Sequence, residues 1–394
     1  MGKFVEYELM QKLSSLSPLG VVRPRNPQCK ICRSTTYHFD VVDFNKYCSP
    51  RPYQFGVADI AVSYYRCSRC DFVFTDFMDG WSTDEMAQFI YNADYIKVDP
   101  EYASARPIRT AIAMAALFRG CEHLKILDYG SGSGEFARQL MARGFKYVES
   151  YDPFSSPNRP NGKFDLIFLF EVVEHVCHPL DTFADVVQML KDDAAIVIGQ
   201  TLQPPNIDEI RARWWYIAPR NGHISTYSDW TFLVISRVAG LLYRRGQGLY
   251  GFQKGFMEGP LAVALDRVGP TVELVQLFAR DDKQWHGLEN CDGRGFRWSS
   301  VQKLTWPGVV CVGGLAMVEI PFCMEIREGF AQDCKILIDG TVVPTRLRSE
   351  ALVGEANVCA GSHTVQLVTP EPISPKALRG VPDERMLGLA VLAT

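Results

Sequence analysis

Residues 124–135 read LKILDYGSGSGE, an apolar run that ends at Asp128 and is followed by Gly130, Gly132 and Gly134. Continuous apolar residues predict a buried strand, and the glycines allow a sharp turn and a close approach of backbone to a ligand. Helix-forming residues follow at once, and the N–H groups at a helix start favour a carboxylate or a phosphate. This order predicts a ligand-binding turn between a strand and a helix.

A second acidic residue follows this turn at the end of the next strand-like run. The next strand-like run ends at Asp152, 24 residues after Asp128. An acid in this place can accept hydrogen bonds from both hydroxyls of a ribose. The loop differs from the dinucleotide pattern GxGxxG, because Glu135 stands where its last glycine would be. The alternative interpretation is that the glycines serve only a tight turn.

Strand-like and helical stretches alternate beyond the glycine turn. The runs at 147–152, 164–170 and 194–201 are separated by turns or helical residues, which predicts an α/β fold with a parallel sheet covered on both faces. Only 11 residues lie between Asp152 and Phe164, too few for a helical crossover. We therefore expect a shortened sheet that lacks one strand and one helix of the usual series.

Three stretches together resemble class I S-adenosylmethionine-dependent methyltransferases. They are LDYGSGSGEFA at 127–137, YDP at 151–153 and FDLIFLFEVVEHVCHPL at 164–180. The resemblance covers about residues 121–250 and is strongest for the branch that contains ubiquinone O-methyltransferases and sugar C-methyltransferases. It implies a Rossmann-like sheet and S-adenosylmethionine as the methyl donor.

The resemblance also implies which residues contact this cofactor. The glycine turn would line its methionine end, Asp152 would hold its ribose, Phe154 would cover its adenine, and Glu171 would form part of the pocket wall. The implied cofactor-binding residues are Asp128, Gly130, Gly132, Gly134, Asp152, Phe154 and Glu171.

Methyl transfer to a hydroxyl or a carbon acid needs a base that takes the proton. The stretch WWYIAPRNGHISTYSDW at 214–230 follows the predicted fifth strand and carries His223. Loops at the carboxyl ends of parallel strands form ligand sites, and a similar segment supplies the base in sugar C-methyltransferases. We therefore expect His223 to be the base, the alternative being a histidine that caps the next helix or bonds to backbone. Four neighbours are candidates for lining an acceptor pocket: Tyr216, Arg220, Tyr227 and Trp230.

The stretch EVVEH at 171–175 suggests a second mechanism. Ubiquinone O-methyltransferases and small-RNA terminal methyltransferases use such a cluster with a later histidine to bind Mg²⁺ against substrate hydroxyls. The resemblance implies metal-assisted O-methylation as a variant. The candidate catalytic residues are His223, Glu174 and His175, and the implied Mg²⁺ ligands are these three and Glu171.

Two CxxC pairs precede the methyltransferase-like region. Cys29 and Cys32 form the first pair, and Cys67 and Cys70 form the second after 34 intervening residues. Two such pairs supply four thiolates for a closed tetrahedral site, which is typical of structural Zn²⁺. Sugar C-methyltransferases carry a similar module ahead of the catalytic domain. The alternatives are core cysteines without metal and a redox CxxC.

The 394 residues are too many for one hydrophobic core, so we expect several domains. They are an N-terminal segment at 1–26, a zinc-binding module at 27–80, a helical lid at 81–120, the methyltransferase domain at 121–280 and a β-sandwich at 281–394. Two groups of aromatic residues have two possible roles, contact with a ligand or packing in a core. They are Tyr91, Tyr95 and Tyr102 in the lid, and Trp285, Trp298 and Trp306 in the last domain.

Charge and hydropathy exclude two classes of partner. The chain has 41 Lys and Arg against 45 Asp and Glu, so no global positive field attracts nucleic acid. No run approaches the roughly 18 apolar residues of a membrane-spanning helix, and the N-terminus lacks a signal-peptide core. We therefore expect a cytoplasmic protein.

These observations lead to one expected function and two alternatives. We expect S-adenosylmethionine-dependent methyl transfer to a sugar or surface-glycan intermediate. The first alternative is an O-methyltransferase for a small phenolic or polyketide-like acceptor, with or without Mg²⁺. The second is a non-catalytic glycan-binding scaffold that keeps the cofactor site. Turnover to S-adenosylhomocysteine separates the enzymes from the scaffold.

Overall fold

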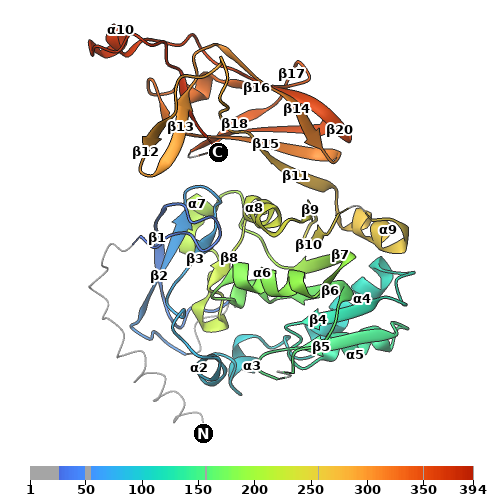
Figure 1. Cartoon of the computed structure of the whole chain (residues 1–394). Helices are drawn as coiled ribbons and strands as arrows, with labels where there is room; N and C mark the ends of the chain where they lie inside the picture. The colour runs from blue at the N-terminus through green and yellow to red at the C-terminus, as the bar shows by residue number, and fades with distance from the viewer. Residues whose placement is uncertain (1–25, 49–54, 156–157, 256, 349, 394) are drawn as a thin grey trace. The chain divides into compact units, whose positions relative to one another are not determined.

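A computed structural model gives the fold of the chain (Figure 1). The chain divides into two compact units, Met1–Pro270 and Thr271–Thr394. The domain boundaries expected within them stay predictions, and the expected segment 1–26 lies outside the described residues except for Asn26. The described residues are 26–48, 55–155, 158–255, 257–348 and 350–393.

A mixed sheet lies at the centre of the first unit. Its strands follow the spatial order β5-β4-β6-β7-β10-β9. The first four run parallel, whereas β10 is antiparallel to β7 and β9 is antiparallel to β10. The expected α/β fold is therefore confirmed, with an antiparallel edge added. The strands are β4 (Lys125–Tyr129), β5 (Tyr147–Tyr151), β6 (Phe164–Phe170), β7 (Leu190–Gly199), β9 (Leu242–Arg244) and β10 (Leu249–Gln253).

Helices cover both faces of this sheet. One apolar cluster joins α4 (Ala105–Leu117), α5 (Glu135–Met141) and α9 (Gly259–Val268) to inward residues of β4, β6 and β7. On β10, Phe252 points to the opposite face of the sheet, because successive residues of a strand alternate between its two faces. Its ring lies 5.5 Å from that of Phe183 and 5.4 Å from that of Phe232. These two rings belong to the helices of the second face, α6 (Pro179–Gln188) and α8 (Asp229–Ala239).

The connection from β5 to β6 is short, as the spacing predicts. The described residues between Tyr151 and Phe164 contain no helix and no strand. Phe164–Phe170 is continuously apolar apart from Asp165 and lies between β4 and β7. The carboxyl ends of the parallel strands thus bring Asp152 and Glu171 to the same edge of the sheet as the glycine turn.

The N-terminal cysteine region builds a second sheet in the first unit, with the order β1-β2-β3-β8. Its last strand comes from far along the chain and pairs antiparallel with β3. The cysteine region is therefore part of the same compact unit as the methyltransferase-like sheet. The strands are β1 (Thr36–Asp43), β2 (Ala61–Cys67), β3 (Val73–Phe74) and β8 (Ser225–Thr226).

The region between the cysteines and β4 is helical, as expected. Ser82 and Glu85 form a capping box at the start of α2 (Thr83–Phe89), and α3 (Tyr95–Val98) precedes α4. None of the helices in the described part of the chain is long and apolar enough to cross a membrane. The remaining short helices of this unit are η1 (Val173–His175), α7 (Ile207–Ile210), η2 (Arg211–Arg213) and η3 (Pro219–Asn221).

The second unit is rich in strands. One group follows the order β12-β13-β21-β15-β11, with β19 paired to β15 and β18 to β19, and the other follows β14-β20-β16-β17. That these sheets form a β-sandwich stays a prediction. The elements are β11 (Thr271–Gln276), β12 (Glu289–Cys291), β13 (Arg294–Trp298), β14 (Lys303–Cys311), β15 (Gly314–Glu325), η4 (Ala331–Asp333), β16 (Lys335–Ile338), β17 (Thr341–Val342), β18 (Thr345–Arg348), β19 (Ala351–Val358), β20 (Gly361–Val368), α10 (Pro375–Arg379) and β21 (Leu389–Leu392).

The three tryptophans of the second unit belong to its core. Trp285, Trp298 and Trp306 are 7%, 8% and 1% exposed, and all three lie in one apolar cluster. The indole N–H of Trp306 donates to the carbonyl of Phe278 at 2.8 Å. Of the two interpretations of these residues, the structure therefore supports packing and not a surface for sugars.

Candidate active site

The glycine turn adopts backbone angles that explain its sequence. Gly130, Gly132 and Gly134 have φ of 76°, 52° and 71°, the left-handed region that favours glycine. At Gly130, a Cβ atom would lie 2.4 Å from Cγ2 of Val172. The backbone N–H of Gly130 also donates to the carbonyl of Tyr151 at 2.7 Å, which ties the turn to the end of β5. A side chain at Gly130 would therefore disturb the turn.

Two buried polar atoms at this turn have no hydrogen-bond partner among the described residues. They are Oδ2 of Asp128 and Oγ of Ser131. Asp128 is 3% exposed, and burial raises its pKa to about 7. Native proteins rarely leave buried polar atoms unpaired, because each costs free energy. A bound ligand with a cationic or hydroxyl donor would complete this arrangement.

Asp152 connects the end of β5 to the glycine turn. Its Oδ1 accepts hydrogen bonds from the backbone N–H groups of Phe154 and Ser155, both at 2.9 Å, and its Oδ2 accepts from Gly132 at 3.0 Å. A carboxylate oxygen can accept two hydrogen bonds, so Oδ2 retains capacity for a ligand hydroxyl. The ribose contact expected for Asp152 stays a prediction, and the structure adds a role in shaping the turn.

Aromatic rings connect the cofactor side to the acid–histidine side. Phe154 is 42% exposed, and its ring centroid lies 5.0 Å from that of Tyr91 in the expected lid. The Tyr91 ring lies in turn 5.8 Å from His175. The next lid tyrosine, Tyr95, donates its hydroxyl to the carbonyl of Asn221 at 3.2 Å. Tyr91 and Phe154 therefore stand between the glycine turn and the histidines.

Glu171 follows β6 in a strained conformation. Its φ is 54°, which is uncommon for a residue other than glycine, and its N–H donates to the carbonyl of Gly199 at 3.1 Å. Oε2 lies 3.7 Å from a guanidinium nitrogen of Arg106. Burial, followed by the nearby Glu174 carboxyl, raises the pKa of Glu171. Glu171 therefore pairs with a cation of the chain at the carboxyl end of the strand.

Glu174, His175 and His223 meet although they come from separate segments, and we call them the Glu–His–His cluster. Each offers one ligand atom, and these atoms lie within 4.8 Å of one another. The two imidazole centroids are 4.9 Å apart, and Nε2 of His175 is 4.0 Å from Oε1 of Glu174. The structure thus brings together three of the four predicted Mg²⁺ ligands, while Glu171 is not in this group.

Hydrogen bonds define the tautomer of both histidines. Nδ1 of His223 lies 2.9 Å from the carbonyl of Tyr216, and Nδ1 of His175 lies 3.1 Å from the carbonyl of Gly222. A carbonyl only accepts, so each Nδ1 carries the proton and each Nε2 keeps a lone pair. Burial lowers the pKa of His175 to about 4 and the pKa of His223 well below its ordinary value. Both imidazoles are therefore neutral and can act as a base or a metal ligand.

Glu174 is fully buried, and only one of its two carboxylate oxygens has a hydrogen-bond partner among the described residues. Oε1 accepts the hydroxyl proton of Tyr216 at 2.6 Å, whereas Oε2 has no partner among the described residues. Burial raises the pKa of Glu174 to about 7. A buried carboxylate with one unpaired oxygen, grouped with two neutral imidazoles, is a donor set that a cation would complete.

Sequence reasoning did not find the role of Tyr216. Its hydroxyl orients Glu174 and its carbonyl orients His223, and the residue is only 2% exposed. Tyr216 is therefore a buried support of the Glu–His–His cluster, and a place for it in an acceptor pocket stays a prediction. The other three candidates are also buried and donate to backbone carbonyls: Arg220, Tyr227 and Trp230. A buried aromatic residue near a histidine carries no sequence signal that separates these roles.

The four cysteines gather into one group, here called the four-cysteine cluster. The sulfurs of Cys29 and Cys70 are 3.5 Å apart, and those of Cys32 and Cys67 are 3.4 Å apart. A tetrahedral Zn²⁺ site with Zn–S bonds of about 2.3 Å would separate its sulfurs by about 3.8 Å. Backbone N–H groups donate to the sulfurs of Cys29 and Cys67 at 3.3 Å, which favours thiolates. The cluster could therefore hold a metal ion.

Comparisons with known proteins identify the central region. Residues 80–242 match the family model described as a methyltransferase domain. The chain therefore contains a methyltransferase domain. No curated protein sequence matches the chain.

Similar solved structures are distant from this chain. An O-methyltransferase family protein from Burkholderia thailandensis shares 15% identity over 43% of this chain, with a TM-score of 0.31, and this chain spans 64% of its length. The 1,6-didemethyltoxoflavin-N1-methyltransferase of the same organism, solved with bound S-adenosylhomocysteine, has 12% identity, coverage of 42% and 85%, and a TM-score of 0.32. A possible histamine N-methyltransferase from Thermotoga maritima has 12% identity, coverage of 38% and 97%, and a TM-score of 0.25. Similarity of this size does not indicate an acceptor.

The glycine turn gives a first testable prediction. Gly130→Ala should weaken S-adenosylhomocysteine binding at least about tenfold in calorimetry, because its Cβ would collide with Val172. Gly144→Ala is the matched control, since Gly144 also has a positive φ of 99° but open space around it. If both variants bind as the unchanged chain does, the turn does not hold the cofactor.

Proposed function

We propose that the methyltransferase domain transfers the methyl group of S-adenosylmethionine to a hydroxyl group of a sugar or glycan intermediate, with a divalent cation at the Glu–His–His cluster. The observation that carries this proposal is that Glu174, His175 and His223 each offer one ligand atom within 4.8 Å of the others, while Oε2 of the buried Glu174 has no hydrogen-bond partner among the described residues. Such a preformed donor set favours an enzyme over a glycan-binding scaffold.

The glycine turn fits S-adenosylmethionine. The unpartnered Oδ2 of Asp128 suits the ammonium group at the methionine end, and Oδ2 of Asp152 has capacity for a ribose hydroxyl. Phe154 offers an exposed ring for the adenine. When bound, the cofactor supplies a methyl group on a sulfonium, which needs a nucleophile in line with it.

The donor set of the cluster selects among cations. Mg²⁺ prefers oxygen ligands, whereas imidazole nitrogens with one carboxylate suit Mn²⁺, Fe²⁺ or Zn²⁺. We therefore propose Mn²⁺ or a similar ion in place of the expected Mg²⁺, held by Glu174, His175 and His223. A bound cation would orient the acceptor hydroxyl and lower its pKa. Glu171 stays outside this set, next to Arg106.

The chain prepares this site by its own hydrogen bonds. The carbonyls of Tyr216 and Gly222 hold the protons of the two histidines on Nδ1, so that both Nε2 lone pairs stay free. The Tyr216 hydroxyl fixes one oxygen of Glu174 and leaves the other for the ligand. These outer contacts commonly determine the orientation and affinity of metal ligands.

We also propose that the four-cysteine cluster holds a structural Zn²⁺. Its four sulfurs leave no position for a substrate, unlike catalytic zinc sites, which keep one position open. The separations of 3.4 Å and 3.5 Å exceed an S–S bond of about 2.05 Å, so the pairs are not disulfides.

The cation proposal predicts a metal-dependent activity. With S-adenosylmethionine and a panel of sugar, glycan and phenolic acceptors, formation of S-adenosylhomocysteine should stop in EDTA and return with Mn²⁺ more than with Mg²⁺. Glu174→Gln and His223→Ala should each reduce turnover at least about 100-fold, with unchanged S-adenosylhomocysteine affinity. Glu171→Gln should have the smaller effect, because Glu171 is not a ligand.

The same assay can contradict the proposal in two ways. Turnover that resists EDTA but needs His223 would assign that residue as a general base without metal. Turnover confined to phenolic acceptors would overturn the sugar assignment and leave the cation intact. Zinc content is measured in parallel, so that loss of the structural metal is not mistaken for loss of the catalytic one.

The zinc proposal predicts a second, independent metal. After EDTA dialysis, elemental analysis should still find about one zinc per chain. Cys67→Ser should lose this zinc together with soluble yield, whereas Cys121→Ser, which changes a buried cysteine outside the four-cysteine cluster, should keep it. A folded Cys67→Ser variant without zinc would show that the metal is not needed for folding.

A further inference from the structure

The N-terminal region makes several hydrogen bonds to the segment that carries His223. Nζ of Lys46 donates to the carbonyl of Trp214 at 2.9 Å, and the carbonyl of Lys46 accepts from the N–H of Arg220 at 3.1 Å. The N–H of Cys48 donates to the side-chain oxygen of Asn221 at 2.8 Å. The approach to His223 is thus fixed by residues that precede it by more than 160 positions.

Residues 61–75, which contain β2, the second CxxC pair and β3, contact His223 itself, and we call them the cysteine hairpin. The buried hydroxyl of Tyr64 donates to the carbonyl of His223 at 2.7 Å. The N–H of Thr75 donates to the carbonyl of Ile224 at 2.9 Å, and β3 pairs with β8 directly after it. The N–H of Ile224 donates to the carbonyl of Glu174 at 3.0 Å. The backbone at 223–226 is therefore hydrogen-bonded to the cysteine hairpin on one side and to Glu174 on the other.

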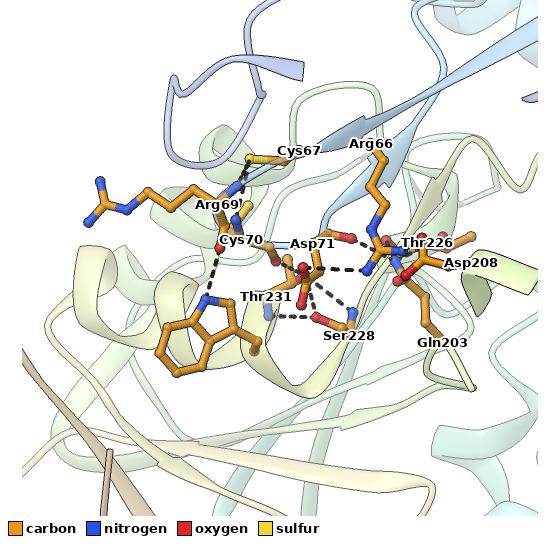
Figure 2. A network of polar contacts seen from close by, with 11 residues as sticks. Arg66, Cys67, Arg69, Cys70, Asp71, Gln203, Asp208, Thr226, Ser228 and Thr231 are labelled. Atoms are coloured by element: carbon orange, nitrogen blue, oxygen red, sulfur yellow. Dashed lines mark hydrogen bonds and ion pairs between the residues drawn. The ribbon is translucent and has the colours of Figure 1, made fainter. Parts of the chain in front are cut away.

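The turn of the cysteine hairpin also binds the start of α8 (Figure 2). The carbonyl of Arg69 accepts from the indole N–H of Trp230 at 3.1 Å. The carbonyl of Cys70 accepts from the hydroxyl of Thr231 at 2.7 Å. Next to them, the amide of Gln203 donates to the carbonyls of Asp71 at 3.0 Å and Thr226 at 2.9 Å. The carbonyls of Arg69, Cys70 and Asp71 belong to peptide units next to the second cysteine pair, so a metal at that pair would fix their directions.

We propose that the cysteine hairpin is a positioning element for His223, so that the four-cysteine cluster sets the geometry of the Glu–His–His cluster. Its effect on cation binding rests on the proposed function. The hydrogen bonds of Tyr64 and Thr231 are the links through which the positioning acts. A merely structural module would stabilise the fold without altering the imidazole of His223.

Two conservative variants test this proposal in the full chain. Tyr64→Phe removes the donor to the His223 carbonyl. Thr231→Val keeps the side-chain shape but removes the link to Cys70 together with the hydrogen bond from the N–H of Ser228. Tyr243→Phe is the matched control, because it removes an equally buried tyrosine hydroxyl that donates to Asp229 and does not touch the cysteine hairpin. His223→Ala identifies the His223 signals.

The first measurement is ¹⁵N-histidine NMR of the protein without a cation at the Glu–His–His cluster. Both test variants should shift or broaden the His223 ring signals, and Tyr243→Phe should leave them unchanged. In a Mn²⁺ titration, both test variants should bind about tenfold more weakly, as expected for loss of a contact behind a ligand. Zinc content and S-adenosylhomocysteine affinity should be the same in the unchanged chain, Tyr64→Phe, Thr231→Val and Tyr243→Phe.

The outcomes separate the two proposals. If the unchanged chain binds no Mn²⁺, the cation proposal fails, and the NMR comparison still decides the positioning role. Unchanged His223 signals in both Tyr64→Phe and Thr231→Val would overturn that role. If Tyr64→Phe does not fold, Thr231→Val alone decides, since its change is isosteric. Equal shifts in the Tyr243→Phe control would also overturn it, because they would reflect general loosening of the unit.

Discussion

The pairing of β3 with β8 is the interaction on which the candidate active site depends. It involves only two residues on each strand, Val73 with Thr226 and Phe74 with Ser225. It nevertheless places a segment that follows the last parallel strand, β7, against a module that precedes the sheet. On one side this contact leads to the four cysteines, and on the other it leads to His223 and Glu174. The fold thereby makes one compact unit from regions that the sequence order separates.

Burial without compensating charge is the second constraint on the site. Asp128 and Glu174 are acids whose pKa values burial raises to about 7, and the two histidines are neutral for the same reason. Each acid also keeps one oxygen without a partner among the described residues. Such groups raise the free energy of the folded protein unless a bound ligand supplies the missing hydrogen bond or opposite charge. The two acids mark the two places where cationic groups would be most stabilised.

Local patterns in the sequence predict the parts of the site that local structure determines. The glycine turn and the short connection after Asp152 depend on neighbouring residues, and the structure has both. The meeting of Glu174, His175 and His223 was accessible only through the resemblance to a family, since no periodicity connects these residues. Glu171 lies outside the Glu–His–His cluster because of its positive φ and its pairing with Arg106. A sequence reveals neither feature.

The position of β8 has a consequence for the order in which the molecule forms. Val73 and Thr226 are 153 residues apart in the chain. Contacts of such long range carry a large loop-closure cost and form late unless earlier structure has already brought the ends together. The parallel sheet and its helices can assemble from nearer neighbours, whereas the pairing of the cysteine hairpin with β8 requires that closure. The hydrogen bonds from the cysteine hairpin to the segment of His223 therefore depend on contacts of longer range than those that build the parallel sheet.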